Sequence, residues 1–207
     1  MIEEGETVPK FQLEDADGKL VKSSQFKGKK FVVYFYPRDF TPGCTTEADE
    51  FSKDYKKFQK EGIEIIGISK DDVTSHRKFC DKMGIPYILL ADVETEVSKK
   101  FGVWGLKKFM GREFMGINRS TFLVNEKGKI FKVFPNVKPK GHAKEVLEEF
   151  EKVLTKTNFV VGQNVGFDIN VMGCEFYGLK IDSLLTKLPG LDTCTETTAN
   201  LCKIPGG

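Results

Sequence analysis

The chain has 207 residues, of which 40% are apolar and 12% aromatic, and its formal net charge is +2. These values are typical of a soluble globular protein with one main core, and the interleaved Lys and Glu residues do not favour a nucleic acid or an anionic membrane as partner. No apolar run approaches the roughly 18 residues of a membrane span, and the start MIEEGETVPKF lacks the pattern of a secretory signal, so we expect a cytoplasmic protein without membrane contact.

Apolar and amphipathic segments alternate along the first 156 residues. The apolar, β-branched segments predict strands at residues 30–37, 63–69 and 87–92 and two further strands within 120–135, joined by a Glu-Lys-Gly turn. The amphipathic segments predict helices at residues 47–62, 71–84, 93–102 and 140–156. This order indicates an α/β fold with a mixed sheet, and continuous apolar runs such as FVVYFY suit a sheet that is covered on both faces.

The composition changes near residue 156. Residues 157–207 contain only 3 of the 32 basic and 5 of the 30 acidic residues, but they hold three of the five cysteines, Cys174, Cys194 and Cys202. We therefore divide the chain into a domain at residues 1–156 and a C-terminal extension at residues 157–207. Five cysteines in a reducing compartment favour catalytic, metal-binding or simply buried thiols over a disulfide framework, and the odd number leaves at least one unpaired.

The stretch YPRDFTPGCTTEADEF, residues 36–51, places Cys44 where a predicted strand ends and a helix begins. Catalytic groups collect at this end of the strands in open α/β sheets, and the unpaired N–H groups of the helix favour a thiolate there. Pro42 suits the first helical position and Gly43 allows a small ligand to approach closely. The Thr41 hydroxyl can either cap the helix or point at the group that the sulfur attacks. The same position also suits an ordinary buried cysteine.

The segment PRDFTPGCTTEA, residues 37–48, resembles the Pro-x-x-x-Thr-x-x-Cys motif of the peroxiredoxins, and its surroundings resemble the bacterioferritin comigratory protein or peroxiredoxin Q subfamily. Later segments resemble that subfamily in the same order, namely SKDDVTSHRKF, LLAD, FGVWGLKKFMGREFMGINRSTFLVNEKGKI and VKPKGHAKEVLEE. The resemblance spans about residues 5–155. It implies a thioredoxin-like fold and the reduction of hydrogen peroxide or organic hydroperoxides by a cysteine thiolate.

The resemblance implies four catalytic positions. Cys44 matches the attacking cysteine, Pro37 and Thr41 match the rest of the motif, and Arg119 matches the active-site arginine of the family. The chemistry needs such groups, because a thiolate that splits an O–O bond requires donors for the charge on the leaving oxygen. The Arg119 guanidinium stays charged and offers several donors, although an arginine at the start of a strand is otherwise typical of a surface salt bridge. We expect Pro37 to shape the pocket and shield the sulfur.

The position of a second, resolving cysteine departs from the subfamily. Many members carry it five residues after the first cysteine, where this chain has Asp49. The resemblance implies Cys80 as the substitute, 36 residues after Cys44 and at a location used by a minority of the family. A disulfide between the two requires their Cα atoms to come within about 7 Å, and therefore local unwinding of the helices. The alternative is a single-cysteine enzyme that uses an external thiol.

The two histidines of the chain, His76 and His142, lie in segments that resemble the subfamily. His76 precedes Cys80 by four residues and would share its helix face, but two ligands do not make a structural zinc site, so we expect a surface or capping histidine. We expect His142 to be structural. The resemblance implies no nicotinamide, flavin, haem or metal cofactor.

The C-terminal extension resembles a fragment of a different family. The segment FVVGQNVGFDINVMGCEFYG resembles the middle of a DEDD-type 3′-to-5′ exonuclease, with Asn164, Phe167 and Asp168 at the matching positions. A two-metal nuclease site needs further carboxylates, and their motifs do not occur in this sequence. The extension also has a net charge of −2, from 3 basic and 5 acidic residues, so we expect neither nuclease activity nor a nucleic-acid partner.

The sequence therefore predicts a thiol peroxidase of the thioredoxin-like fold, with Cys44 attacking the peroxide and Cys80 or an external thiol resolving the product. The resemblance implies thioredoxin or a similar dithiol protein as reductant, a role in antioxidant defence, and a monomer or weak homodimer. The alternative is a redox-sensing or disulfide-relay module, in which Cys44 is oxidised without appreciable turnover.

Overall fold

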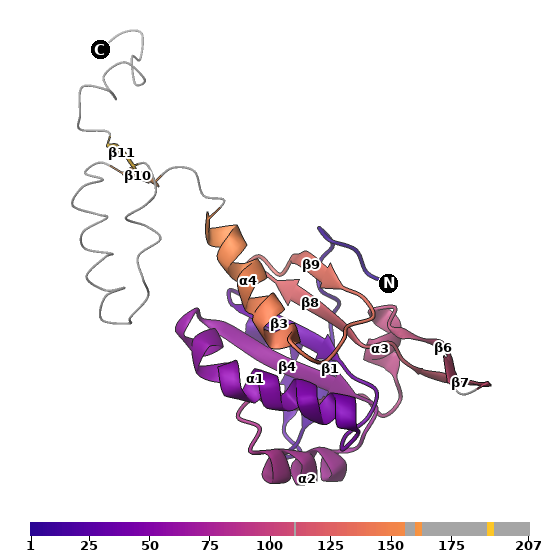
Figure 1. The fold of residues 1–207 in the computed structure, drawn as a ribbon. Helices are drawn as coiled ribbons and strands as arrows, with labels where there is room; N and C mark the ends of the chain where they lie inside the picture. Colours follow the sequence, from indigo (N-terminus) through magenta and orange to yellow (C-terminus); the bar gives the residue numbers. More distant parts are fainter. Residues whose placement is uncertain (110, 156–159, 163–189, 193–207) are drawn as a thin grey trace. The chain divides into compact units, whose positions relative to one another are not determined.

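The chain divides into two units, Met1–Leu147 and Glu148–Gly207. The structure is a computed structural model, and it describes residues 1–109, 111–155, 160–162 and 190–192 (Figure 1). The second unit includes a parallel pair of short strands, β10 (Val160–Gly162) and β11 (Gly190–Asp192). The predictions on the exonuclease-like positions and on the three cysteines of the extension lie outside the described residues.

A seven-stranded mixed sheet forms the centre of the first unit, in the order β2-β1-β5-β4-β3-β8-β9. Its strands are β1 (Gln12–Asp15), β2 (Leu20–Lys22), β3 (Lys30–Phe35), β4 (Ile63–Ser69), β5 (Ile88–Ala91), β8 (Ser120–Val124) and β9 (Ile130–Phe134). Strands β3, β4 and β5 run parallel, whereas β8 is antiparallel to β3. The predicted α/β fold with a mixed sheet is confirmed.

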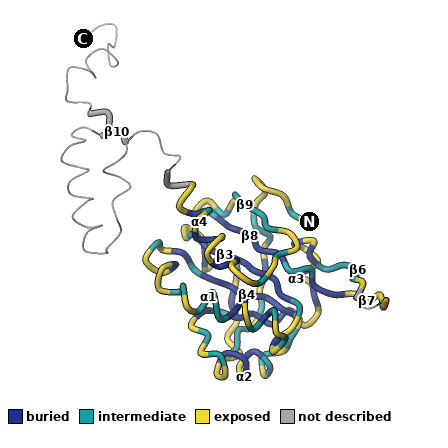
Figure 2. The backbone as a smooth tube through the Cα atoms, viewed as in Figure 1, coloured by how far each residue is buried: buried dark blue, intermediate teal, exposed yellow. Residues whose placement is uncertain are grey.

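Both faces of the sheet are covered, as Figure 2 shows for the buried central strands. The helices are η1 (Ser23–Phe26), α1 (Pro42–Lys60), α2 (Val73–Met83), α3 (Glu96–Lys100) and α4 (His142–Thr155). Successive side chains of β3 point to opposite faces. Phe35 packs against Phe101 beside α3, with ring centroids 4.9 Å apart. Tyr34 stacks on Phe51 of α1 on the other face, also at 4.9 Å.

The structure differs from the sequence prediction mainly at polar or short segments. Helix α1 begins at Pro42, the residue that suits a first helical position, and so extends five residues before the amphipathic segment at 47–62 and includes Cys44. Four strands were not predicted, namely β1, β2, β6 (Trp104–Phe109) and β7 (Arg112–Ile117). Strands β6 and β7 form a separate hairpin and therefore lack the apolar run of a central strand. In the described part of the chain, no helix combines the length and the apolar character needed to cross a membrane.

Candidate active site

The loop between β3 and α1 fixes the position of Cys44. Strand β3 ends at Phe35 and helix α1 begins at Pro42. Proline loses no hydrogen bond here, because the N–H of a first helical residue has no partner within the helix. Thr41 is extended at the helix N-cap, and its carbonyl accepts the first helical hydrogen bond from the Thr45 N–H at 2.8 Å. Cys44 therefore lies in the first turn of α1, where it is buried and where the backbone N–H groups favour an anion.

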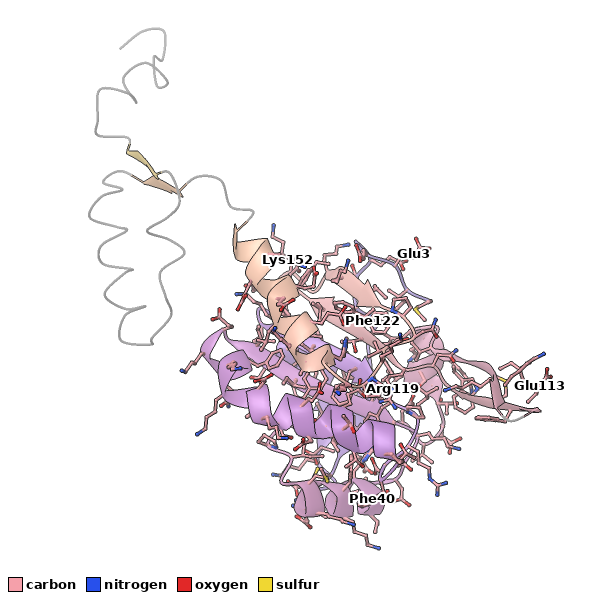
Figure 3. The ribbon with its side chains drawn as sticks, viewed as in Figure 1. Glu3, Phe40, Glu113, Arg119, Phe122 and Lys152 are labelled. Carbon is pink, nitrogen blue, oxygen red and sulfur yellow. The ribbon has the colours of Figure 1, made fainter. Side chains whose placement is uncertain are left out.

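Arg119 contacts the thiol of Cys44. Strand β8 pairs antiparallel with β3, and Ser120 lies opposite Phe35 in this register. Because Arg119 directly precedes Ser120, the pairing brings it to the end of β3 that leads into the Cys44 loop; Figure 3 marks its place in the fold. The Nη2 group of Arg119 donates a hydrogen bond to Cys44 Sγ at 3.2 Å. A guanidinium has five donors, so it can stabilise a thiolate and still donate to a bound peroxide.

Glu47 is the second partner of Arg119, and the sequence analysis missed it. Its side chain lies one turn after Cys44, is 1% exposed, and accepts a hydrogen bond from Arg119 Nη1 through Oε2. Its Oε1 has no hydrogen-bond partner among the described residues. Burial raises the pKa of Glu47 to about 7, against the opposite effect of the guanidinium. The carboxyl fixes the orientation of Arg119: Nη1 donates to Glu47 and Nη2 donates to the Cys44 sulfur.

The raised pKa of Glu47 predicts a pH-dependent stability. Since this pKa lies at about 7 against an ordinary value of 4.5, the folded protein binds more protons than the unfolded chain between these values. The extra protons stabilise the folded protein at low pH. This stabilisation is lost as the pH rises through the pKa of Glu47 in the folded protein, about 7. From pH 5 to pH 8 the free energy of unfolding should fall by about 2 to 3 kcal/mol relative to that of Glu47→Gln, which has no carboxyl to titrate. Urea denaturation of both proteins at several pH values measures this, and parallel curves would contradict it.

Comparison with known proteins identifies the family. The model of the AhpC/TSA family matches residues 5–133. The chain is 43% identical over 155 residues to Peroxiredoxin Bcp of Bacillus subtilis, an alignment that covers 75% of this chain and 99% of that one. It is 39% identical to Peroxiredoxin Bcp of Escherichia coli, with 70% and 94% covered. The chain belongs to the AhpC/TSA family. It is a peroxiredoxin, and hence a thiol peroxidase with a thioredoxin-like fold.

Solved structures agree with this assignment. Peroxiredoxin Q of Xanthomonas campestris superposes with a TM-score of 0.66 at 37% identity, covering 69% of this chain and 90% of that chain. A cysteine variant of Xylella fastidiosa PrxQ superposes with a TM-score of 0.71 at 32% identity, covering 74% and 98%. The similarity thus extends over nearly the full length of these bacterial proteins and matches the subfamily that the sequence motifs resemble.

Gly43 and Thr41 stand next to Cys44 in the loop and first turn of this peroxiredoxin site. A Cβ atom on Gly43 would lie 3.3 Å from Arg119 Nη2 and 3.2 Å from Pro139 Cγ, so a larger residue would push the guanidinium away from the sulfur. Thr41 stands at the N-cap but makes no side-chain capping bond; its hydroxyl donates instead to the Arg38 carbonyl at 3.1 Å. Of the two roles that the sequence left open for this hydroxyl, helix capping is therefore not seen.

A second cation lies close to the peroxiredoxin site. Pro37 lines a cavity of about 440 Å³ together with Lys107 of β6 and Phe114 of β7. Burial and the charge of Arg119 lower the pKa of Lys107, while the Cys44 thiolate acts in the opposite direction. The sequence analysis missed this lysine, because only the folding of the β6–β7 hairpin brings it within electrostatic reach of the sulfur.

Cys80 lies apart from Cys44 in the folded peroxiredoxin. It is a buried residue of α2, and both cysteines are free thiols. Burial raises the pKa of Cys80 to about 11 from an ordinary value of 9.0, which lowers its thiolate fraction at neutral pH about a hundredfold. Cys80 lines a cavity of about 420 Å³ with Asp17, Arg77 and Tyr87, and neither Cys44 nor Arg119 lines that cavity. The structure therefore does not bring the two predicted redox cysteines into contact.

The two histidines are both buried. The expectation of a surface or capping histidine at position 76 is wrong, because His76 is 0% exposed and its Nδ1 lies 3.0 Å from the carboxylate of Asp39. His142 is the first residue of helix α4, and its Nε2 lies 2.8 Å from the Thr121 hydroxyl. His142 therefore connects α4 to β8, whereas His76 connects α2 to the loop before Cys44.

Proposed function

We propose that this peroxiredoxin reduces hydrogen peroxide and organic hydroperoxides with the Cys44 thiolate. The observation that carries the proposal is the hydrogen bond from Arg119 Nη2 to Cys44 Sγ in the first turn of α1. The thiolate attacks one peroxide oxygen, the O–O bond breaks, and the second oxygen leaves as hydroxide or alkoxide, which takes a proton from water. Cys44 becomes a sulfenic acid, and the peroxide is reduced by two electrons.

The surrounding groups stabilise the charge that moves during this step. Arg119 and the N–H groups at the start of α1 offset the negative charge as it passes from sulfur to the leaving oxygen. The Thr41 hydroxyl lies in the same loop and can exchange its bond to the Arg38 carbonyl for one to a peroxide oxygen. Pro37 and Lys107 form a wall of the adjoining cavity. Because Cys44 and Glu47 are buried, each donor is worth more here than it would be in water.

We propose further that Cys80 resolves the sulfenic acid. The Cys80 sulfur would attack the Cys44 sulfur, a disulfide would form, and water would leave; a dithiol protein such as thioredoxin would then reduce the disulfide. The spacing supports this role: two cysteine-to-serine variants of Xanthomonas campestris Peroxiredoxin Q are substituted at positions 36 residues apart, as are Cys44 and Cys80. Because Cys80 is buried with a raised pKa, α2 has to open before the thiol can react.

Replacing Cys80 by serine tests this scheme. The peroxide-dependent oxidation of Cys44 should stay within about threefold of wild type, while steady-state turnover with thioredoxin should fall about tenfold or more, since the sulfenic acid is not resolved internally. Mass spectrometry with peptide mapping should find a Cys44–Cys80 disulfide in the wild type and a Cys44 sulfenic acid in the variant. Full turnover of Cys80→Ser would favour the single-cysteine route through an external thiol.

We also propose that residues 1–156 form the catalytic domain and residues 157–207 an addition to it. Alignment of only 155 residues already covers 99% of the Bacillus subtilis relative, which supports a boundary at this point. The protein would act in the cytoplasm in antioxidant defence, as a monomer or weak homodimer. Measuring peroxide consumption with a dithiol reductant distinguishes this function from that of a disulfide relay. A peroxidase consumes many peroxide molecules per chain, whereas the relay would consume about one per Cys44.

A further inference from the structure

A buried cluster joins the loop before Cys44 to helix α2. Its centre is Asp39, which is 4% exposed and lies five residues before Cys44. One carboxylate oxygen accepts a hydrogen bond from the Tyr36 hydroxyl at 2.8 Å. The other accepts one from the Ser75 hydroxyl at 2.7 Å and lies 3.0 Å from His76 Nδ1. We call Tyr36, Asp39, Ser75 and His76 the Asp39 cluster.

The Asp39 cluster contains a carboxylate at neutral pH. Burial acts to raise the pKa of Asp39, but the bonds from His76, Ser75 and Tyr36 and the charge of His76 together hold it below its ordinary value. Since a carboxylate only accepts hydrogen bonds, His76 Nδ1 carries a hydrogen and donates it. Bonds to a buried carboxylate are roughly twice as strong as neutral ones, so this cluster is the strongest polar link between the loop and α2 among those described.

The cluster joins the loop that leads into Cys44 to α2, the helix that carries Cys80. Ser75 and His76 lie in the first turn of α2, and Cys80 follows His76 by one turn. The loop makes further contacts in the same region: the Asp39 N–H donates to Asp71 Oδ2 at 2.8 Å, and the ring of Phe40 lies 5.0 Å from that of Phe79 (Figure 3). Opening α2 to release Cys80 therefore has to break bonds that end on the Cys44 loop.

One atom of the cluster favours the opened state. His76 is 0% exposed, yet its Nε2 has no hydrogen-bond partner among the described residues. An unpaired buried nitrogen destabilises the closed arrangement and would regain water when α2 opens. The bonds to Asp39 thus stabilise the closed state, whereas the unpaired Nε2 of His76 destabilises it. Weakening the bonds to Asp39 should therefore raise the population of the state in which α2 is open.

We propose that Asp39 is a positioning residue that sets how readily α2 opens to deliver Cys80 to the sulfenic acid of Cys44. The inference rests on the proposed resolving role of Cys80. While the cluster is intact, Cys44 keeps its site and Cys80 stays buried as a thiol. When it opens, Cys80 gains both access to Cys44 and solvent that favours its thiolate. The disulfide step, rather than the attack on peroxide, is therefore the step that Asp39 slows.

The Asp39→Asn variant tests this role because it keeps the size of the side chain and removes its charge. After rapid quenching and mass spectrometry of single-turnover reactions, disulfide formation should be about tenfold faster than in wild type, with the peroxide-dependent step changed less than threefold. The peroxide concentration that converts half of Cys44 to sulfinic acid should rise in the same proportion, because the sulfenic acid survives for a shorter time. Amide hydrogen exchange in α2 should also accelerate.

Matched variants keep the test decisive. Lys78→Ala alters an exposed residue of α2 outside the cluster and should behave as wild type. Ser75→Ala removes one donor and should give a smaller acceleration, which Ser75→Thr should reverse; this pair carries the test if Asp39→Asn does not fold. Disulfide formation by Asp39→Asn at or below the wild-type rate would overturn the inference alone. Absence of a Cys44–Cys80 disulfide in the wild type would instead overturn the resolving role on which it rests.

Discussion

Replacing Cys44 by serine is expected to lower peroxide turnover by about 10⁴-fold or more. The serine hydroxyl is not ionised at neutral pH, and neither Arg119 nor the start of α1 can make it a nucleophile comparable to a thiolate. The substitution is nearly isosteric, so the buried site should keep its packing. A coupled assay with thioredoxin, thioredoxin reductase and hydrogen peroxide measures turnover directly.

The control for this prediction is an unchanged fold. Circular dichroism and the urea midpoint of Cys44→Ser should match those of the wild type, so that the loss of activity belongs to the sulfur alone. Cysteine residues in the extension could also consume peroxide slowly, and Cys44→Ser reports that background. Turnover near the wild-type level in this variant would show that a different thiol performs the reaction, which would remove the basis of the proposed mechanism.

Replacing Arg119 by methionine is expected to lower the rate constant for oxidation of Cys44 by about 10²- to 10³-fold. Methionine fills part of the same space but supplies no donor to the sulfur or to the leaving oxygen. Arg119→Lys keeps the charge as a point charge and loses the forked geometry that serves Glu47 and Cys44 together, so it should recover only part of the rate. Stopped-flow mixing with peroxide, under conditions of one oxidation per chain, isolates this step.

A second variant separates the role of Arg119 in the reaction from its role in stability. Without the guanidinium, Glu47 becomes a buried carboxyl without its ion-pair partner, and the Arg119→Met variant should be less stable for this reason. The double variant Arg119→Met with Glu47→Gln removes both charged groups and should regain stability while remaining slow. If the double variant oxidised Cys44 as fast as wild type, the donor role of Arg119 would be wrong and the single variant would merely have distorted the site.

The sequence predicted the elements whose patterns are local. Strand β4 was predicted at its observed bounds, residues 63–69, because the isoleucine-rich segment IEIIGIS directly follows Gly62 and β-branched residues favour a strand. Helix α2 was predicted to within two residues, because Asp72 caps its start and Gly84, with a φ of 62°, ends it. The strands β1, β2, β6 and β7 were missed, because they are short or polar and lack the apolar run of a central strand.

The sequence by itself determined the chemistry at Cys44: a thiol after Thr-Pro-Gly, at the point where an apolar strand meets a helix, in a motif that resembles the peroxiredoxins. The resemblance also implied Arg119, but only the tertiary structure showed that Glu47 shares its guanidinium with the thiol. The pairing of β3 with β8 brings Arg119 to Cys44 and Glu47 across more than 70 residues, and the contact of the Asp39 loop with α2 buries His76. Spacing along the chain cannot report such contacts, because they arise from strand register and helix docking, which join residues without any local pattern.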